Sequence, residues 1–205
     1  MDDFDELLRQ AEIAHGHLCA GQILGVRMAL LALSRLGIED PRGADRKKLV
    51  TFVEIDRCAT DAIGLVTGCR LGRRALKFRD WGKMAATFVH LPAARAIRIV
   101  ALENSRELAQ QLHPEIESKG QQQMLAYREL SDRELFREQW VTVDLPENEM
   151  PGYKGPRVTC DECGEGVNFG HFVEQPAEPG IEAASPPRRL CLSCAHPELR
   201  YWRPV

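Results

Sequence analysis

Two pairs of cysteines near the C-terminal end constrain this chain more than any other feature of its sequence. The first pair is Cys160-x-x-Cys163, followed by Gly164, and the second is Cys191-x-x-Cys194. Two thiolates on a tight turn can point at one centre, and two such turns supply the four soft ligands of a tetrahedral Zn²⁺ ion. The glycine permits the positive φ that turns backbone N–H groups toward the sulfurs. The spacing therefore predicts a four-cysteine zinc finger.

The metal of such a finger is expected to be structural, because four thiolates leave no ligand position open. The long stretch between the two pairs fits a β-hairpin whose tip lies within 175–187. Residues 195–201 predict a short helix with Cys191 and Cys194 at its N-terminus, where the macrodipole favours thiolates. The expected arrangement is treble-clef-like. Iron–sulfur ligation is the alternative for the same four residues.

The cysteine count also indicates the compartment. Seven cysteines, an odd number with no export signal, argue against a disulfide framework, because the cytosol keeps thiols reduced. No apolar run approaches the roughly 20 residues that cross a bilayer. The formal net charge of −3 gives no general attraction to nucleic acid or to acidic membranes. We therefore expect a cytoplasmic protein that binds neither membranes nor nucleic acid.

The rest of the chain has the pattern of an α+β core domain. Three prolines and two glycines within 144–156 mark a linker between this core, at 1–143, and the finger domain at 157–205. We expect a small mixed or antiparallel sheet with packed helices, and the helix at 22–36, apolar nearly all round, should be buried. The other helices are expected at 2–14, 57–67, 103–111 and, in two pieces, 115–140, and the strands at 49–55, 83–89 and 96–102.

A second group of possible ligands lies near the N-terminus. His15, His17 and Cys19 fall within one pentapeptide, directly before the helix expected to be buried. In an extended segment all three side chains would share one side. A cysteine close to a helix N-terminus is also a better metal ligand or nucleophile. The simpler interpretation is a pair of loop histidines beside a buried cysteine.

Four short segments carry a resemblance to a known family. They are HGHLCAGQILGVRM at 15–28, VEIDRCATDAI at 53–63, TGCRLG at 67–72 and DWGKMA at 80–85. In this order they resemble the signature of the FmdE family, whose members are associated with molybdenum formylmethanofuran dehydrogenase. Ala20 stands where the family usually has proline, and Arg70 where it usually has threonine. Many members of the family also carry a C-terminal zinc finger.

The resemblance implies an α+β core with an exposed His/Cys cluster that binds a metal or forms an active site. The residues expected in this cluster are His17 and Cys58, then Cys19, then His15 and Cys69. Cys58, His17 and Cys19 are also the candidate catalytic residues. A mixed set with fewer than four protein ligands leaves a position for water or substrate. Its metal is expected to be zinc or another transition metal.

Three further polar residues lie in the same segments. Glu54 and Asp61 flank Cys58 and are expected to orient a ligand or to act as acid–base partners. The alternative for both carboxylates is ordinary capping and ion pairing. Lys83 belongs to the glycine–lysine step that leads into the next strand.

Two functions are compatible with these patterns. The first is a metal-binding accessory or metal-handling partner of a molybdenum or tungsten formylmethanofuran or formate dehydrogenase-type enzyme, expected as a homodimer. The absence of GxGxxG and Walker sequences is consistent with this role. The second is a small metalloenzyme, such as an oxidoreductase component, that uses the N-terminal cluster. A zinc-finger regulator is a third interpretation, which the acidic balance of the C-terminal region disfavours.

Overall fold

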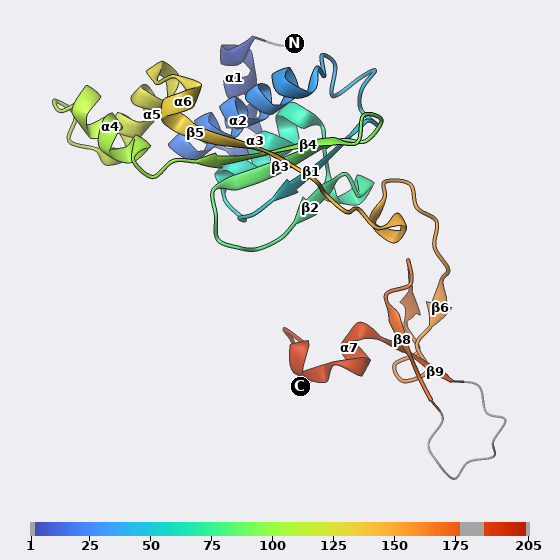
Figure 1. The fold of residues 1–205 in the computed structure, drawn as a ribbon. Helices are drawn as coiled ribbons and strands as arrows, with labels where there is room; N and C mark the ends of the chain where they lie inside the picture. The colour runs from blue at the N-terminus through green and yellow to red at the C-terminus, as the bar shows by residue number, and fades with distance from the viewer. Residues whose placement is uncertain (1–2, 177–186, 204–205) are drawn as a thin grey trace. The chain divides into compact units, whose positions relative to one another are not determined.

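The chain folds as two units, Met1–Leu145 and Pro146–Val205, each with its own core (Figure 1). The computed structural model describes residues 3–176 and 187–203. No helix within these two ranges is long and apolar enough to cross a membrane.

The first unit is a mixed sheet covered by helices, which confirms the predicted α+β class. Its five strands lie in the order β2-β1-β3-β4-β5, with β1 and β2 parallel and the other neighbours antiparallel. The elements are α1 (Phe4–His15), α2 (Ala20–Leu36), β1 (Leu49–Val53), α3 (Cys58–Thr67), η1 (Leu71–Arg73), β2 (Leu76–Phe78), β3 (Ala85–His90), β4 (Arg95–Ala101), α4 (Ser105–Leu112), α5 (Lys119–Glu129), α6 (Asp132–Leu135) and β5 (Phe136–Val141).

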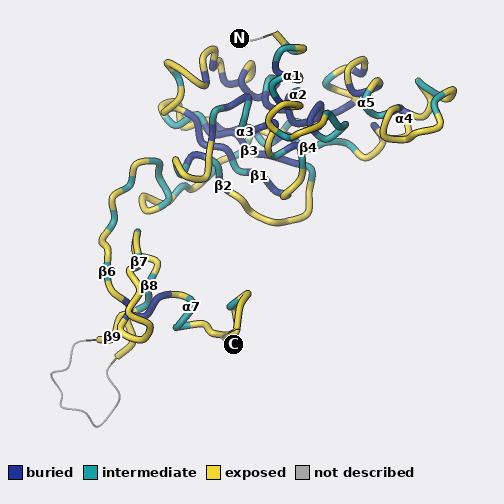
Figure 2. The backbone as a smooth tube through the Cα atoms, turned by 180° about the vertical axis from the view of Figure 1, so that it is seen from behind, coloured by how far each residue is buried: buried dark blue, intermediate teal, exposed yellow. Residues whose placement is uncertain are grey.

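Helix α2 forms the centre of this unit, as its apolar sequence predicts. It packs against α1, α3, α5 and the sheet, and Figure 2 shows it buried along most of its length. A glycine permits the approach of α3, because a Cβ atom at Gly25 would lie 2.5 Å from the carbonyl oxygen of Ala59. Gly37, at φ 67°, ends the helix in the left-handed conformation.

The helices lie mainly on one face of the sheet (Figure 1). The core on that side is formed by side chains such as Phe88, Ile97 and Ile99, all fully buried. The opposite face carries a smaller apolar cluster centred on Val50 and Val89. The strands are therefore buried from both sides over much of their length.

Strand β5 differs from the sequence-based prediction. The helix expected to continue to Trp140 ends at Leu135, and residues 136–141 instead pair with β4 in antiparallel register. Arg, Glu and Gln in this segment favour a helix locally, but pairing with an open sheet edge outweighs that weak preference. Trp140 remains 54% exposed, with the Arg95 guanidinium 4.5 Å from its ring centroid. Strand β2 was not predicted either.

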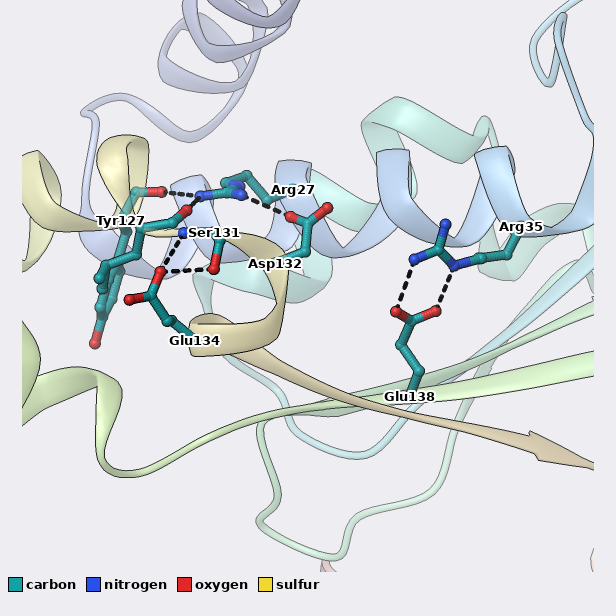
Figure 3. Close-up of polar contacts among 8 residues, drawn as sticks. Arg27, Arg35, Tyr127, Ser131, Asp132, Glu134 and Glu138 are labelled. Atoms are coloured by element: carbon teal, nitrogen blue, oxygen red, sulfur yellow. Dashed lines mark hydrogen bonds and ion pairs between the residues drawn. The ribbon is translucent and has the colours of Figure 1, made fainter.

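A buried arginine fixes α5 and α6 against α2 (Figure 3). Arg27 donates hydrogen bonds to the carbonyl oxygens of Tyr127, at 3.0 Å, and Leu130, and to Oδ1 of Asp132, at 2.6 Å. The two carbonyls belong to the last turn of α5, where no partner within the helix is available. One side chain of α2 therefore caps α5 and holds the start of α6.

Two further polar contacts lie beside it in Figure 3. The Ser131 N–H and hydroxyl both donate to Oε2 of Glu134, at 2.8 and 2.6 Å, which is the predicted capping box. Arg35 makes a two-pronged ion pair with Glu138, at 2.6 and 3.0 Å, and so ties α2 to β5.

The second unit contains two small antiparallel hairpins and a short helix. The predicted hairpin between the cysteine pairs is present as β8 and β9, and most of its expected tip lies outside the described residues. The helix expected at 195–201 begins earlier, at Leu192, and Pro197 starts a separate 3-10 turn. The elements are η2 (Glu147–Glu149), β6 (Val158–Thr159), β7 (Gly166–Val167), β8 (Phe172–Gln175), β9 (Arg188–Cys191), α7 (Leu192–Ala195) and η3 (Pro197–Leu199).

Candidate metal centres

The second unit brings the four paired cysteines together. The Sγ atoms of Cys160, Cys163, Cys191 and Cys194 all lie within 4.8 Å of one another. The first pair sits on the turn from β6 to β7, where Gly164 adopts φ 74°. The second pair lies at the end of β9 and in α7, with Cys191 as the N-cap. This four-cysteine group can hold a metal ion, and its all-thiolate donor set suits zinc.

The backbone around these sulfurs favours negative charge. The N–H of Cys191 donates to Sγ of Cys160 at 3.3 Å. Such backbone hydrogen bonds, from Cys163 first and then Cys191, lower the pKa of Cys160 to about 6. Hydrogen bonding to the Cys191 sulfur raises the pKa of Cys194 to about 12. Four sulfurs this close cannot all ionise without a cation, so the donor set fits a metal.

The first unit brings three of the predicted N-terminal residues together. The ligand atoms of His15, His17 and Cys19 lie within 4.8 Å of one another, and the two imidazole centroids are 4.9 Å apart. His15 is the last residue of α1, and Gly16, at φ 93°, reverses the chain so that His17 turns back toward it. Cys19 is the N-cap of α2. We call these residues the HHC group. His17 is exposed, so the group lies open to solvent.

Asp61 orients one member of the HHC group. Nδ1 of His15 lies 2.9 Å from a carboxylate oxygen of Asp61, on the first turn of α3. Because a carboxylate only accepts, the proton of the imidazole is on Nδ1, and Nε2 keeps the lone pair that binds a metal. This carboxylate–histidine pair is the usual outer shell of a metal-bound imidazole.

Cys58 lies against Cys19 but outside the HHC group. It is the first residue of α3, and a Cβ atom placed at Gly21 would be 3.4 Å from its Cβ and 3.8 Å from Sγ of Cys19. Burial, and then hydrogen bonding with Cys19, raise the pKa of the Cys58 thiol. The structure thus places Cys58 beside Cys19, as a neutral thiol that can donate to its sulfur.

Cys69 is not brought to the HHC group. It is 2% exposed and lies in the core, where the Thr51 hydroxyl donates to its sulfur at 3.5 Å. The sulfur also lies 3.7 Å from the carbonyl oxygen of Leu49. Burial raises the pKa of this thiol. Its surroundings are those of a packed core cysteine.

Glu54 and Lys83 also lie outside the group. Glu54 is buried and both its oxygens accept from Arg98, each at 2.7 Å, an ion pair that raises the pKa of Arg98. The sequence analysis missed Arg98, although a single charge between Ile97 and Ile99 indicates that it needs a partner. Lys83 is exposed, with Nζ 5.7 Å from the centroid of the Trp81 ring.

Comparisons with known proteins agree on the family. The model of the FmdE family, described as "FmdE, Molybdenum formylmethanofuran dehydrogenase operon", matches residues 14–137. This range includes the HHC group, Cys58 and Cys69 and ends before the four-cysteine group.

Two relatives extend the match. A "Probable S-adenosyl-L-methionine-binding protein" of Archaeoglobus fulgidus is 31% identical over 179 residues, which are 78% of this chain and 48% of the relative. The chain thus spans about half the length of that protein. The crystal structure of an FmdE-like protein of the tungsten formylmethanofuran dehydrogenase type, from Syntrophus aciditrophicus, shares the fold, with a TM-score of 0.62 and 20% identity over 96% of this chain and 94% of that one. The chain is therefore a member of the FmdE family, with a C-terminal four-cysteine group.

Proposed function

We propose that this FmdE-family protein is a metal-handling accessory partner of a molybdenum- or tungsten-dependent formylmethanofuran or formate dehydrogenase-type enzyme. The HHC group is the observation that carries the proposal. Two imidazoles and a thiolate can bind Zn²⁺ or another transition metal and leave one position open. An acceptor protein can enter that position, so the metal can pass between proteins by ligand exchange.

The exposure of the group favours transfer over catalysis. His17 is exposed, and His15 and Cys19 are partly exposed. A catalytic metal is usually enclosed so that water is excluded from the reaction. An exposed metal suits a donor, because the acceptor's ligands must reach it directly. The metalloenzyme remains the alternative, and it requires turnover that depends on the same residues.

The C-terminal unit supports contact with a partner protein. We propose that its four cysteines hold zinc, which stabilises a unit that has little apolar core. Exposed apolar side chains lie near its end: Leu192, Leu199, Tyr201 and Trp202. Side chains of this kind are typical of protein interfaces. We also propose a homodimer, which the exposed Trp140 on the edge strand β5 supports.

A cytoplasmic location follows from the cysteine chemistry of this proposal. All seven cysteines are free of disulfides. Reduced thiolates in close groups persist as metal ligands in a reducing compartment.

The partner role is tested with the tagged full chain at native expression level. We expect a stoichiometric complex on size exclusion that contains molybdenum or tungsten by metal analysis. The His17→Ala chain should isolate the same complex, with less metal delivered to the enzyme. A chain that elutes without either metal contradicts the partner role. Turnover of a substrate by the chain alone, abolished by His17→Ala, favours the metalloenzyme instead.

A further inference from the structure

The two partly exposed thiols of the first unit lie side by side, although they come from different helices. Cys19 is the N-cap of α2 and Cys58 is the first residue of α3. Both lie against Gly21, which has no side chain to separate them: its Cβ position is 3.4 Å from Cβ of Cys58 and 3.8 Å from Sγ of Cys19. The close packing of α2 and α3 at Gly25 and Ala59 keeps the two helix starts together.

Only one of these two sulfurs belongs to the HHC group. The ligand atoms of His15, His17 and Cys19 form the compact set, whereas Cys58 contacts Cys19 from outside it. Cys58 can therefore react with Cys19 without being a metal ligand itself. Both thiols are partly exposed, so a small oxidant can reach them.

We propose that Cys19 and Cys58 form a reversible disulfide that releases the metal from the HHC group. This inference rests on the proposed metal-handling function and names the chemistry that triggers release. The disulfide removes the only thiolate of the group and leaves His15 and His17, which hold a metal weakly by themselves. Reduction of the disulfide restores the site.

Hydrogen peroxide serves as the oxidant. The Cys19 thiolate attacks one peroxide oxygen, the O–O bond breaks, and a sulfenic acid and hydroxide form. The Cys58 thiol condenses with the sulfenic acid, which makes the S–S bond and releases water. The hydroxide takes a proton from solvent, so two thiol sulfurs are oxidised and one peroxide becomes two waters. The metal leaves as the divalent cation.

The test uses the full chain loaded with Zn²⁺ and treated with a small excess of hydrogen peroxide. Released zinc is followed with a chromogenic chelator, and disulfides are mapped by mass spectrometry of peptides. We expect a Cys19–Cys58 cross-link to appear in step with about one equivalent of released zinc, and a thiol reductant to restore binding. Zinc released from the four-cysteine group is separated by the variants.

Two matched variants isolate the step. Cys58→Ser keeps the HHC group but cannot form the disulfide, and we expect it to release the N-terminal zinc about tenfold more slowly. Cys69→Ala removes a core thiol and should behave as wild type. Equal release from Cys58→Ser and wild type, or Cys19 oxidised without a link to Cys58, overturns the inference.

The outcomes also separate this inference from the proposed function. If the HHC group holds no zinc before oxidation, both are wrong. If it holds zinc that stays bound when the cross-link forms, only the inference is wrong.

Discussion

His15 and Asp61, which are 46 positions apart in the chain, are joined by a hydrogen bond of 2.9 Å between Nδ1 and a carboxylate oxygen. The contact fixes the ring of a predicted metal ligand before any metal arrives. Asp61→Asn should lower the affinity of the HHC group for Zn²⁺ by about 10- to 100-fold, because outer-shell carboxylates orient the imidazole and raise its basicity. Competition against a chelator of known affinity measures the change.

Asp56→Asn is the control for charge. Asp56 is exposed and precedes Cys58 by two residues, so its substitution removes the same charge near the same helix start. Equal losses in the two variants would show that Asp61 acts only through its charge and not through its contact with His15.

The packing of α2 on α3 depends on a glycine at one position and not at another. Alanine at Gly25 places its Cβ 2.5 Å from the Ala59 carbonyl oxygen, whereas alanine at Gly21 makes only ordinary contacts of 3.4 Å or more. We expect Gly25→Ala to lower the free energy of unfolding by about 1–3 kcal/mol. Gly21→Ala should be neutral or raise it by up to about 1 kcal/mol, because alanine favours the helix. Denaturant unfolding of both variants measures the difference, and similar results for the two would contradict this packing.

The Glu54–Arg98 pair should contribute to stability rather than to metal binding. Glu54→Gln leaves Arg98 without its charged partner, and we expect a loss of about 3 kcal/mol in the free energy of unfolding, because the pair is buried. Glu138→Gln breaks the more exposed pair with Arg35 and should cost no more than about 1 kcal/mol. Zinc content should be unchanged in both. A loss of N-terminal metal in Glu54→Gln would instead place Glu54 in the site.

Acid should weaken the link between α2 and β5. Hydrogen bonding to Arg35 lowers the pKa of Glu138 below its ordinary value of 4.5. A carboxyl whose pKa falls on folding stabilises the folded state above its ordinary pKa, and this contribution is lost as the pH drops through the folded value. Wild type should therefore lose more stability than Arg35→Gln between about pH 5 and pH 3, by up to about 1 kcal/mol. Parallel urea titrations across that range test it, and equal slopes would contradict the assignment.

The four-cysteine group was predictable because its ligands are paired within short sequence turns. The buried helix α2 and its stop at Gly37 were predictable for the same reason: the pattern is local. Strand β5 was not, since residues 136–141 favour a helix until the edge of β4 is available. Such pairing depends on the completed sheet and leaves little trace in the segment itself.

The N-terminal site shows the same division. The HHC group lies within five residues, so its composition was visible, and its geometry follows from the reversal at Gly16. The positions of the two other cysteines depend on tertiary packing. Cys58 reaches Cys19 through the contact of α2 with α3, and Cys69 is buried under Thr51 of β1. The resemblance to the family placed both thiols in one cluster, and only the packing separates them.

The central claim is that the exposed HHC group binds a metal ion, and the metal content of the full chain tests it directly. Protein purified without added metal is analysed as wild type, as His17→Ala and as Cys163→Ser. We expect about two metals per wild-type chain and about one in each variant, because each substitution removes a ligand from a different site. Metal content that is the same in His17→Ala as in wild type would contradict the account, since the only metal would then belong to the four-cysteine group.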